Sequence, residues 1–99
     1  MYIVIFEAVI RQLDAEYHQA VERLRAKAFE DYGCLDFRSY TEKTTDGEEG
    51  EGDKEVTISV WPDLATIEAW RQDSEHQAAQ GKGRQVWYKE VKTTIAKKL

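Results

Sequence analysis

The chain contains a single cysteine, a single proline and no long uninterrupted apolar run. With Cys34 alone, no disulfide can form within the chain, and no zinc site can be built from several thiolates. A membrane-spanning helix needs about 18 or more apolar residues in a row, whereas the apolar N-terminal stretch is interrupted at Glu7. No basic segment precedes that stretch, so we expect a strand rather than a signal peptide, and a protein of the reducing cytoplasm.

The chain also lacks a basic patch. Its 19 acidic and 14 basic residues give a net charge of −5, and five of the acidic residues lie between Asp46 and Asp53. The remaining body is neutral, which argues against a nucleic-acid partner. We expect residues 44–53 to form a mobile, solvated acidic loop. Its glycines do not have the spacing of a helix–loop–helix calcium site.

Several motifs with known chemistry are missing. The sequence has no P-loop, no dinucleotide-binding glycine motif, no serine–histidine–acid set and no cluster of metal ligands. We therefore expect no cofactor and no metal site. Any oxidation would then depend on the substrate's own reactivity with oxygen.

The segment Tyr2–Ile10 is almost continuously apolar and β-branched, which predicts a central strand buried on both faces. Glu7 is the exception, on the same face as Ile3 and Ile5. A buried carboxylate without a partner has a raised pKa and would suit a general base. The alternative is a structural ion pair with Arg84 or with a lysine of the last strand.

A helix is predicted between Asp14, a good N-cap, and Gly33, which stands where a C-terminal stop belongs. Its apolar stripe has helical spacing and consists of Tyr17, Ala20, Val21, Leu24 and Ala28. Leu35–Glu42 and Glu55–Trp61 alternate between apolar and polar residues. We expect these two strands to pair as an antiparallel hairpin.

The last third of the chain predicts two helical pieces and a strand. Pro62 stops the preceding strand, and Asp63 caps a helix that carries Trp70. Asp73 or Ser74 begins a second short piece, which is expected to run through Gln80 and to end at Gly81 and Gly83. The last strand is predicted at Gln85–Ala96, with its faces divided into Trp87, Val91 and Ile95 on one side and Val86 and Tyr88 on the other.

The order strand, helix, strand, strand, helix, strand predicts an α+β fold of the ferredoxin-like type in one domain, residues 1–99. Both amphipathic helices must cover one face of the antiparallel sheet. The other face is apolar too, and no helix remains to cover it. A second copy of the chain is the simplest cover, so we expect a homodimer.

The stretch from Trp70 to Tyr88 is unusually rich in large polar and aromatic residues, which typically line a pocket or a partner surface. His76 has an unperturbed pKa near 6.5, suited to moving protons. The alternative is a helix-end histidine bonded to the backbone or to Glu75. Arg84 follows Gly81 and Gly83 and could orient an anionic or enolate substrate, with an ion pair or a dimer contact as the alternative. Trp70 is a candidate pocket wall, although a core tryptophan would show the same pattern. Trp61, Trp87 and Tyr88 are expected in the core or in a dimer interface rather than in catalysis.

Specific motifs in this chain resemble the antibiotic biosynthesis monooxygenase family, in the dimeric α+β barrel group. They are the first strand YIVIFEAVI, Trp61-Pro62-Asp63, Ala69-Trp70-Arg71, the block EHQAAQ at 75–80 and GRQVWY at 83–88. The resemblance covers essentially the whole chain and implies two sheets that close into a barrel across a dimer. It also implies a pocket in each subunit between sheet and helices.

Characterised members of that family include cofactor-independent oxygenases of polycyclic quinone precursors and haem-degrading enzymes. The haem-degrading branch uses an asparagine on the first strand, a tryptophan on the second helix and a histidine as iron ligand. By this resemblance, Glu7 stands at the asparagine position, Trp70 at the tryptophan and Gln80 at the histidine. Because only the tryptophan is retained, haem binding is disfavoured.

The preferred hypothesis is a homodimeric, cofactor-independent oxygenase acting on a small aromatic or quinone-type substrate. His76 or Glu7 would handle protons, and Trp70, Gln80 and Arg84 would contact the substrate. The main alternative is a non-catalytic small-molecule-binding or stress-related dimer that keeps the pocket. No nucleic acid and no membrane is expected as a partner.

Overall fold

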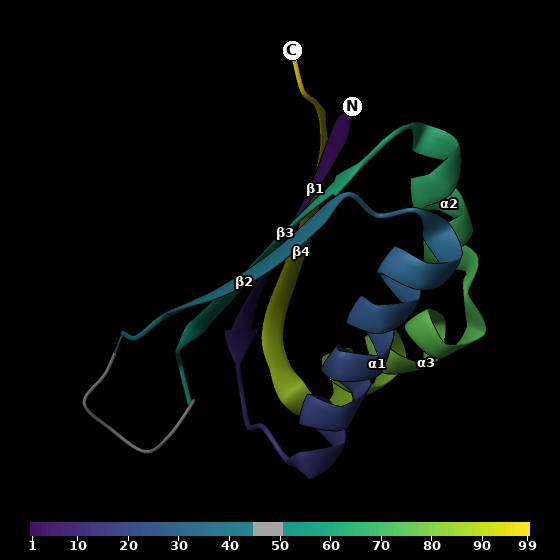
Figure 1. Ribbon diagram of the computed structural model, residues 1–99. Coiled ribbons are helices and arrows are strands. Elements are labelled where there is room, and N and C mark those ends of the chain that lie inside the picture. Colours follow the sequence, from purple (N-terminus) through teal and green to yellow (C-terminus); the bar gives the residue numbers. More distant parts are fainter. Residues whose placement is uncertain (45–50) are drawn as a thin grey trace.

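The computed structural model describes residues 1–44 and 51–99 (Figure 1). The elements in order are β1 (Tyr2–Ile10), α1 (Ala15–Tyr32), β2 (Asp36–Glu42), β3 (Lys54–Trp61), α2 (Leu64–Gln72), α3 (Ser74–Lys82), the π-helical turn η1 (Gly83–Trp87) and β4 (Tyr88–Lys97). The strands form one antiparallel sheet of four in the order β2-β3-β1-β4. Figure 1 shows the helices together on one face of this sheet. The predicted α+β, ferredoxin-like arrangement is confirmed.

The helix boundaries follow the capping residues that the sequence predicts. The Asp14 carboxylate accepts a hydrogen bond from the Tyr17 backbone N–H at the start of α1. Asp63 does the same for Thr66 at the start of α2. Gly33 ends α1 with φ of 72°, a left-handed conformation that a residue without Cβ adopts at little cost.

Strand alternation gives the sheet two different faces. Val4 and Phe6 of β1 point toward the helices, whereas Ile3, Ile5 and Glu7 point away from them. Glu7 lies opposite Val56 of β3 and Lys92 of β4. The uncovered face also carries apolar β3 side chains, namely Val56, Ile58 and Val60, all partly exposed. This is the apolar second face that the sequence predicts.

The segment after α2 differs from its prediction. Helix α3 continues to Lys82, so Gly81 lies inside it, and Gly83 is its C-terminal cap with a right-handed helical conformation. The chain then widens into η1, so the last strand begins at Tyr88 rather than at Gln85. A register shift at Val9/Ile10 puts Tyr88 opposite the buried Ile10. Tyr88 therefore faces the helices, on the same side as Val91, which strict alternation does not predict.

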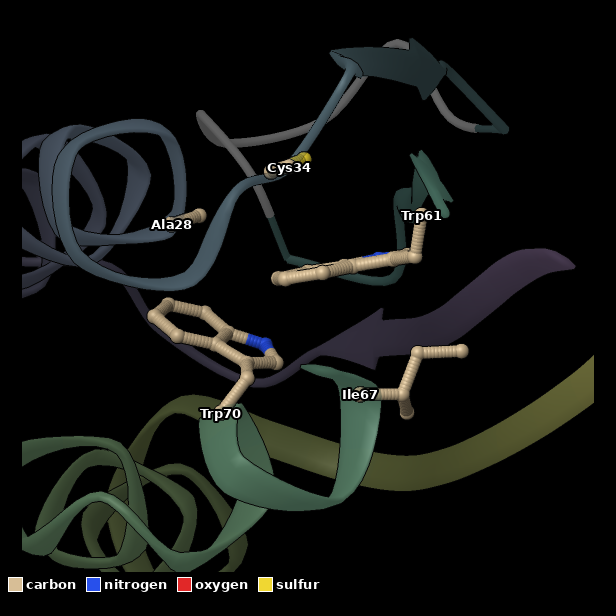
Figure 2. Close-up of a cluster of buried hydrophobic side chains, with 5 residues drawn as sticks. All are labelled: Ala28, Cys34, Trp61, Ile67 and Trp70. Carbon is tan, nitrogen blue, oxygen red and sulfur yellow. The ribbon is translucent and has the colours of Figure 1, made fainter. Parts of the chain in front are cut away.

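The core lies between the sheet and helices α1 and α2. Its buried residues are Ala28, Cys34, Trp61, Ile67 and Trp70. Figure 2 shows the indole rings of Trp61 and Trp70 facing each other, and their centroids are 5.8 Å apart. Trp61 is fully buried, and its indole N–H donates to Ser59 Oγ at 2.9 Å, so this polar atom is satisfied.

One buried carboxylate joins α3 to α1. Asp73 Oδ1 accepts hydrogen bonds from the backbone N–H groups of Glu75 and His76, at 2.9 and 3.1 Å. Asp73 Oδ2 accepts from the Tyr32 hydroxyl at 2.6 Å and pairs with Lys27 Nζ at 2.8 Å. Lys27 and Tyr32 hold the pKa of this carboxyl far below its usual range.

The predicted acidic loop at 44–53 lies largely outside the described residues. Its two described ends are held by hydrogen bonds. Thr44 donates through its hydroxyl to Gly52 O, and through its backbone N–H to Asp53 Oδ1. Backbone bonds join Gly52 and Asp53 to Ile10 at the end of β1.

Across residues 1–44 and 51–99, no helix has the length and apolar character needed to cross a membrane.

Tight packing at Gly83 gives a first prediction. A Cβ at Gly83 would lie 2.8 and 2.9 Å from two ring carbons of Tyr88, so Gly83→Ala must displace that ring. We expect a loss of about 1–3 kcal/mol in the free energy of unfolding. Gly81→Ala is the matched control, because its Cβ meets no described atom within 4 Å. In Gly81→Ala, the higher helix propensity of alanine should raise the free energy of unfolding by about 0.5–1 kcal/mol. Urea unfolding followed by tryptophan fluorescence measures both, and equal effects would contradict the packing argument.

The ion pair of Asp73 gives a second prediction. We expect Asp73→Asn to cost about 2 kcal/mol in the free energy of unfolding at neutral pH, because Lys27 and Tyr32 lose a charged acceptor. The carboxyl has a lowered pKa in the folded state, so its contribution is complete above its unfolded pKa of about 3.9. That contribution is lost as the pH falls below this value toward the folded pKa.

The stability gap between wild type and Asp73→Asn should therefore narrow as the pH is lowered from about 5 to about 2.5. Unfolding is compared at one protein concentration across this range. Asp63→Asn is the control, because it changes an exposed N-cap that makes no salt bridge among the described residues. A gap of constant size for Asp73→Asn would contradict the assigned electrostatic contribution.

Candidate functional site

A cavity of about 280 Å³ lies between the helices and the sheet face that they cover. Its walls come from every strand, from α1, α2 and α3, and from η1. They include six aromatic residues: Phe6, Tyr17, Phe37, Trp70, Trp87 and Tyr88. A cavity of this size with aromatic walls suits a small planar ligand of two or three fused rings.

The floor of the cavity is a row of side chains that crosses the whole sheet. The strand register places Ser39, Thr57, Phe6 and Thr93 side by side on β2, β3, β1 and β4. Ser39 Oγ lies 3.2 Å from Thr57 Oγ1, so these two hydroxyls are joined by a hydrogen bond. The floor therefore offers hydroxyl groups on both sides of an aromatic ring.

His76 stands on the helix side and is fixed by Trp70. The two rings are stacked with centroids 4.2 Å apart, and His76 Nδ1 lies 3.0 Å from the Trp70 carbonyl oxygen. A carbonyl oxygen only accepts hydrogen bonds, so Nδ1 must carry the proton. Burial lowers the pKa of His76, so the ring is neutral near pH 7. Nε2, which has no hydrogen bond to the described residues, is then the free basic nitrogen.

Two tyrosines close the end of the cavity near η1. The rings of Tyr17 and Tyr88 meet edge to face, with centroids 6.1 Å apart. Burial raises the pKa of Tyr88 strongly and that of Tyr17 as well, so both hydroxyls stay protonated. Both tyrosines therefore line this end of the cavity with protonated hydroxyls.

Two arginines contribute positive charge to the cavity wall. Among the described residues, the wall includes Arg71 and Arg84 and no aspartate or glutamate. Both arginines are exposed, and so are Val91 and Thr93 of the edge strand β4. The cavity therefore opens to solvent at Arg71 and Arg84 and along β4, and the wall residue Ser39 of the other edge strand, β2, is exposed too.

The structure brings most of the sequence-predicted site residues together. Trp70, His76, Gln80 and Arg84 all line the cavity. Glu7 does not, because it points to the opposite face of the sheet, between Val56 and Lys92. Trp61 and Trp87 are buried, as expected for core residues.

Other cavity residues were missed by the sequence analysis. The floor hydroxyls of Ser39, Thr57 and Thr93 belong to three different strands, and only the register aligns them. One signal was present in the sequence, since the helix-facing positions of β3 are Thr57 and Ser59 where a packed core strand normally has aliphatic residues. Tyr17 also lines the cavity, whereas its helical spacing predicts only that it belongs to the apolar stripe of α1.

The walls do not suit haem or a metal ion. A carboxamide, that of Gln80, stands where the resemblance places the iron ligand, and the His76 ring is held flat against Trp70. The cavity of about 280 Å³ is small for a porphyrin. Within the described ranges, no group of three or more histidine, cysteine, aspartate or glutamate side chains could hold a metal ion.

Comparison with known proteins agrees with this architecture. Among curated proteins, the chain is 36% identical over 96 residues to the uncharacterised protein YqjZ of Bacillus subtilis, covering 97% of this chain and 77% of that protein. Among solved structures, a conserved protein of Methanosarcina mazei superposes with a TM-score of 0.75 at 14% identity, covering 99% of this chain and 92% of the other.

SnoaB of Streptomyces nogalater, a cofactor-independent oxygenase, superposes with a TM-score of 0.70 at 13% identity. That match covers 99% of this chain and 92% of SnoaB, and at such low identity it shows a shared fold alone. The sequence model of the antibiotic biosynthesis monooxygenase family matches residues 1–82. With most of its length matched by that model, the chain belongs to the antibiotic biosynthesis monooxygenase family.

Proposed function

We propose that the protein is a monooxygenase-like enzyme that oxidises an electron-rich aromatic substrate of two or three rings without a cofactor. The observation that carries this proposal is a neutral imidazole with a free Nε2 in an aromatic-walled cavity. Family membership supports the reaction class. The fold shared with SnoaB is consistent with it.

In this proposal His76 is the general base. Its Nε2 takes a proton from an acidic ring CH₂ or phenol group of the substrate, and the Trp70 carbonyl stabilises the resulting imidazolium through Nδ1–H. The stacked Trp70 holds the imidazole in one orientation. Trp70 and Gln80 contact the substrate, and the apolar walls exclude water from the carbanion that forms.

The oxygen step follows from the substrate's own electrons. The carbanion passes one electron to O₂, and the two radicals join to form a C–O bond and a peroxide anion. His76 returns its proton to the outer oxygen, giving a hydroperoxide. Loss of the second ring hydrogen and cleavage of the O–O bond then release water and leave a carbonyl. Overall, CH₂ and O₂ become C=O and H₂O.

We also propose that the enzyme works as a homodimer joined through the uncovered sheet face. That face carries Val56, Ile58 and Val60 next to Ile3 and Ile5, all partly exposed in the single chain. Burying this patch against a second copy removes apolar surface from water. Glu7 and its neighbour Lys92 lie on the same face, so we assign Glu7 to the dimer contact rather than to proton transfer.

Turnover of dithranol tests the proposed reaction. Dithranol is a tricyclic anthrone whose central CH₂ is acidic, and its oxidation product is a coloured anthraquinone. We expect O₂-dependent formation of the quinone above the spontaneous rate, and a fall in kcat/KM of about 10²–10⁴-fold in His76→Ala. The rate should also fall as the pH drops below the lowered pKa of His76, because the base is then protonated.

His18→Ala is the matched control, because His18 is the other histidine, is exposed and does not line the cavity. It should leave kcat/KM unchanged. Binding of dithranol without turnover would instead favour the alternative of a non-catalytic binding protein. An equal loss of activity in His18→Ala and His76→Ala would contradict the assignment of His76 as the base.

Sedimentation equilibrium tests the dimer. At micromolar concentration we expect twice the chain mass of 11.5 kDa. Ile58→Asp places a charge in the middle of the uncovered face and should give a folded monomer. Glu30→Ala, on the exposed side of α1, should leave the dimer intact. A wild-type monomer at these concentrations would overturn this part of the proposal.

A further inference from the structure

The distribution of charge around the cavity extends the proposed function. The chain as a whole carries a net charge of −5, yet the described cavity wall has two arginines and no carboxylate. The other polar wall groups include hydroxyls and an amide, which can donate hydrogen bonds, whereas His76 presents its unprotonated Nε2. On an acidic protein, two exposed arginines at the edge of a cavity attract anions locally.

The two arginines at the mouth are not equivalent. Arg71 has a partner, since its guanidinium lies 3.8 Å from Glu68 Oε2. Within the described part of the chain, Arg84 makes no salt bridge and no side-chain hydrogen bond to another group. Its charge is therefore available to a ligand, whereas that of Arg71 is partly balanced.

The position of Arg84 suits a ligand that enters with its rings first. Arg84 belongs to η1 at the rim, and Trp87 and Tyr88 follow it closely into the aromatic wall. A planar ring system among these walls would leave its charged edge at the guanidinium. The fork of an arginine binds a carboxylate through two parallel hydrogen bonds, which fixes the plane of the ligand as well as its charge.

We infer that the ligand of this cavity is an aromatic carboxylate of two or three rings, whose carboxylate is bound by Arg84 at the mouth. This inference rests on the proposed function, because it names the substrate class of the same cavity. An ion pair fully exposed to water would contribute little. Here the bound ring system covers one side of the guanidinium, which lowers the local dielectric and strengthens the pair.

The test compares two probes of the same shape and different charge, 2-naphthoate and its neutral isostere 2-naphthamide, by isothermal titration calorimetry. We expect the wild-type protein to bind the naphthoate about tenfold more tightly. In Arg84→Gln this ratio should fall to about one while the affinity for the naphthamide stays the same. Arg71→Gln should reduce the ratio less, because Glu68 already balances that charge.

Lys43→Gln is the control for overall charge, since Lys43 is exposed just after the end of β2 and does not line the cavity. It should leave the ratio unchanged. Equal binding of both probes, tighter binding of the naphthamide, or no binding of either probe would overturn the inference. A ratio that falls as far in Lys43→Gln as in Arg84→Gln would overturn it too.

Failure of this inference is distinguishable from failure of the proposed reaction. Dithranol carries no carboxylate, so its His76-dependent turnover does not require Arg84 to bind an anion. Equal affinity for both probes with His76-dependent turnover intact would reject the carboxylate alone. A preserved preference for the naphthoate without any turnover would reject the oxygenase and keep the anion site.

Discussion

The Asp73 carboxylate holds the helical layer of this protein in place. It caps α3 through two backbone N–H groups, and it binds the Tyr32 hydroxyl and the Lys27 ammonium of α1. These contacts fix where α3 begins. His76 lies in the first turn of α3, so its ring is brought onto Trp70 at the end of α2. Asp73 therefore sets the position of the backbone at His76, and the contacts with Trp70 set the orientation of its ring.

The chemistry proposed for the cavity depends on a single hydrogen bond made there. The Trp70 carbonyl accepts from His76 Nδ1–H and thereby leaves Nε2 unprotonated. Burial keeps the ring neutral, and the absence of carboxylates from the described part of the cavity wall avoids a competing site for the proton. The same absence makes Arg84 the dominant charge at the mouth. The free Nε2 of His76 inside the cavity and the unbalanced charge of Arg84 at its mouth therefore have one cause. Both depend on the lack of carboxylates in the described part of the wall.

The sheet separates these functions by strand alternation. One face carries aromatic and hydroxyl side chains into the cavity, and the other carries Val56, Ile58 and Val60 outward. A shift of one residue in register would exchange the two sets. Because side chains alternate along β1, Glu7 points to the uncovered face. His76, the other residue that the sequence predicts to handle protons, lies on the helix side of the sheet. Periodicity placed Glu7 with Ile3 and Ile5, but it did not say which face the helices cover.

The sequence by itself determined the element order, the capping residues Asp14, Asp63 and Gly33, and the ferredoxin-like topology. These follow from local rules, namely period-2 and period-3.6 hydrophobicity and the backbone preferences of single residues. The tertiary structure alone decided the start of β4, the inward turn of Tyr88 and the hydroxyl row of Ser39, Thr57 and Thr93. A register shift, a π-helical turn and strand pairing between distant segments set those features. Each depends on contacts between residues far apart in the chain, about which local periodicity carries no information.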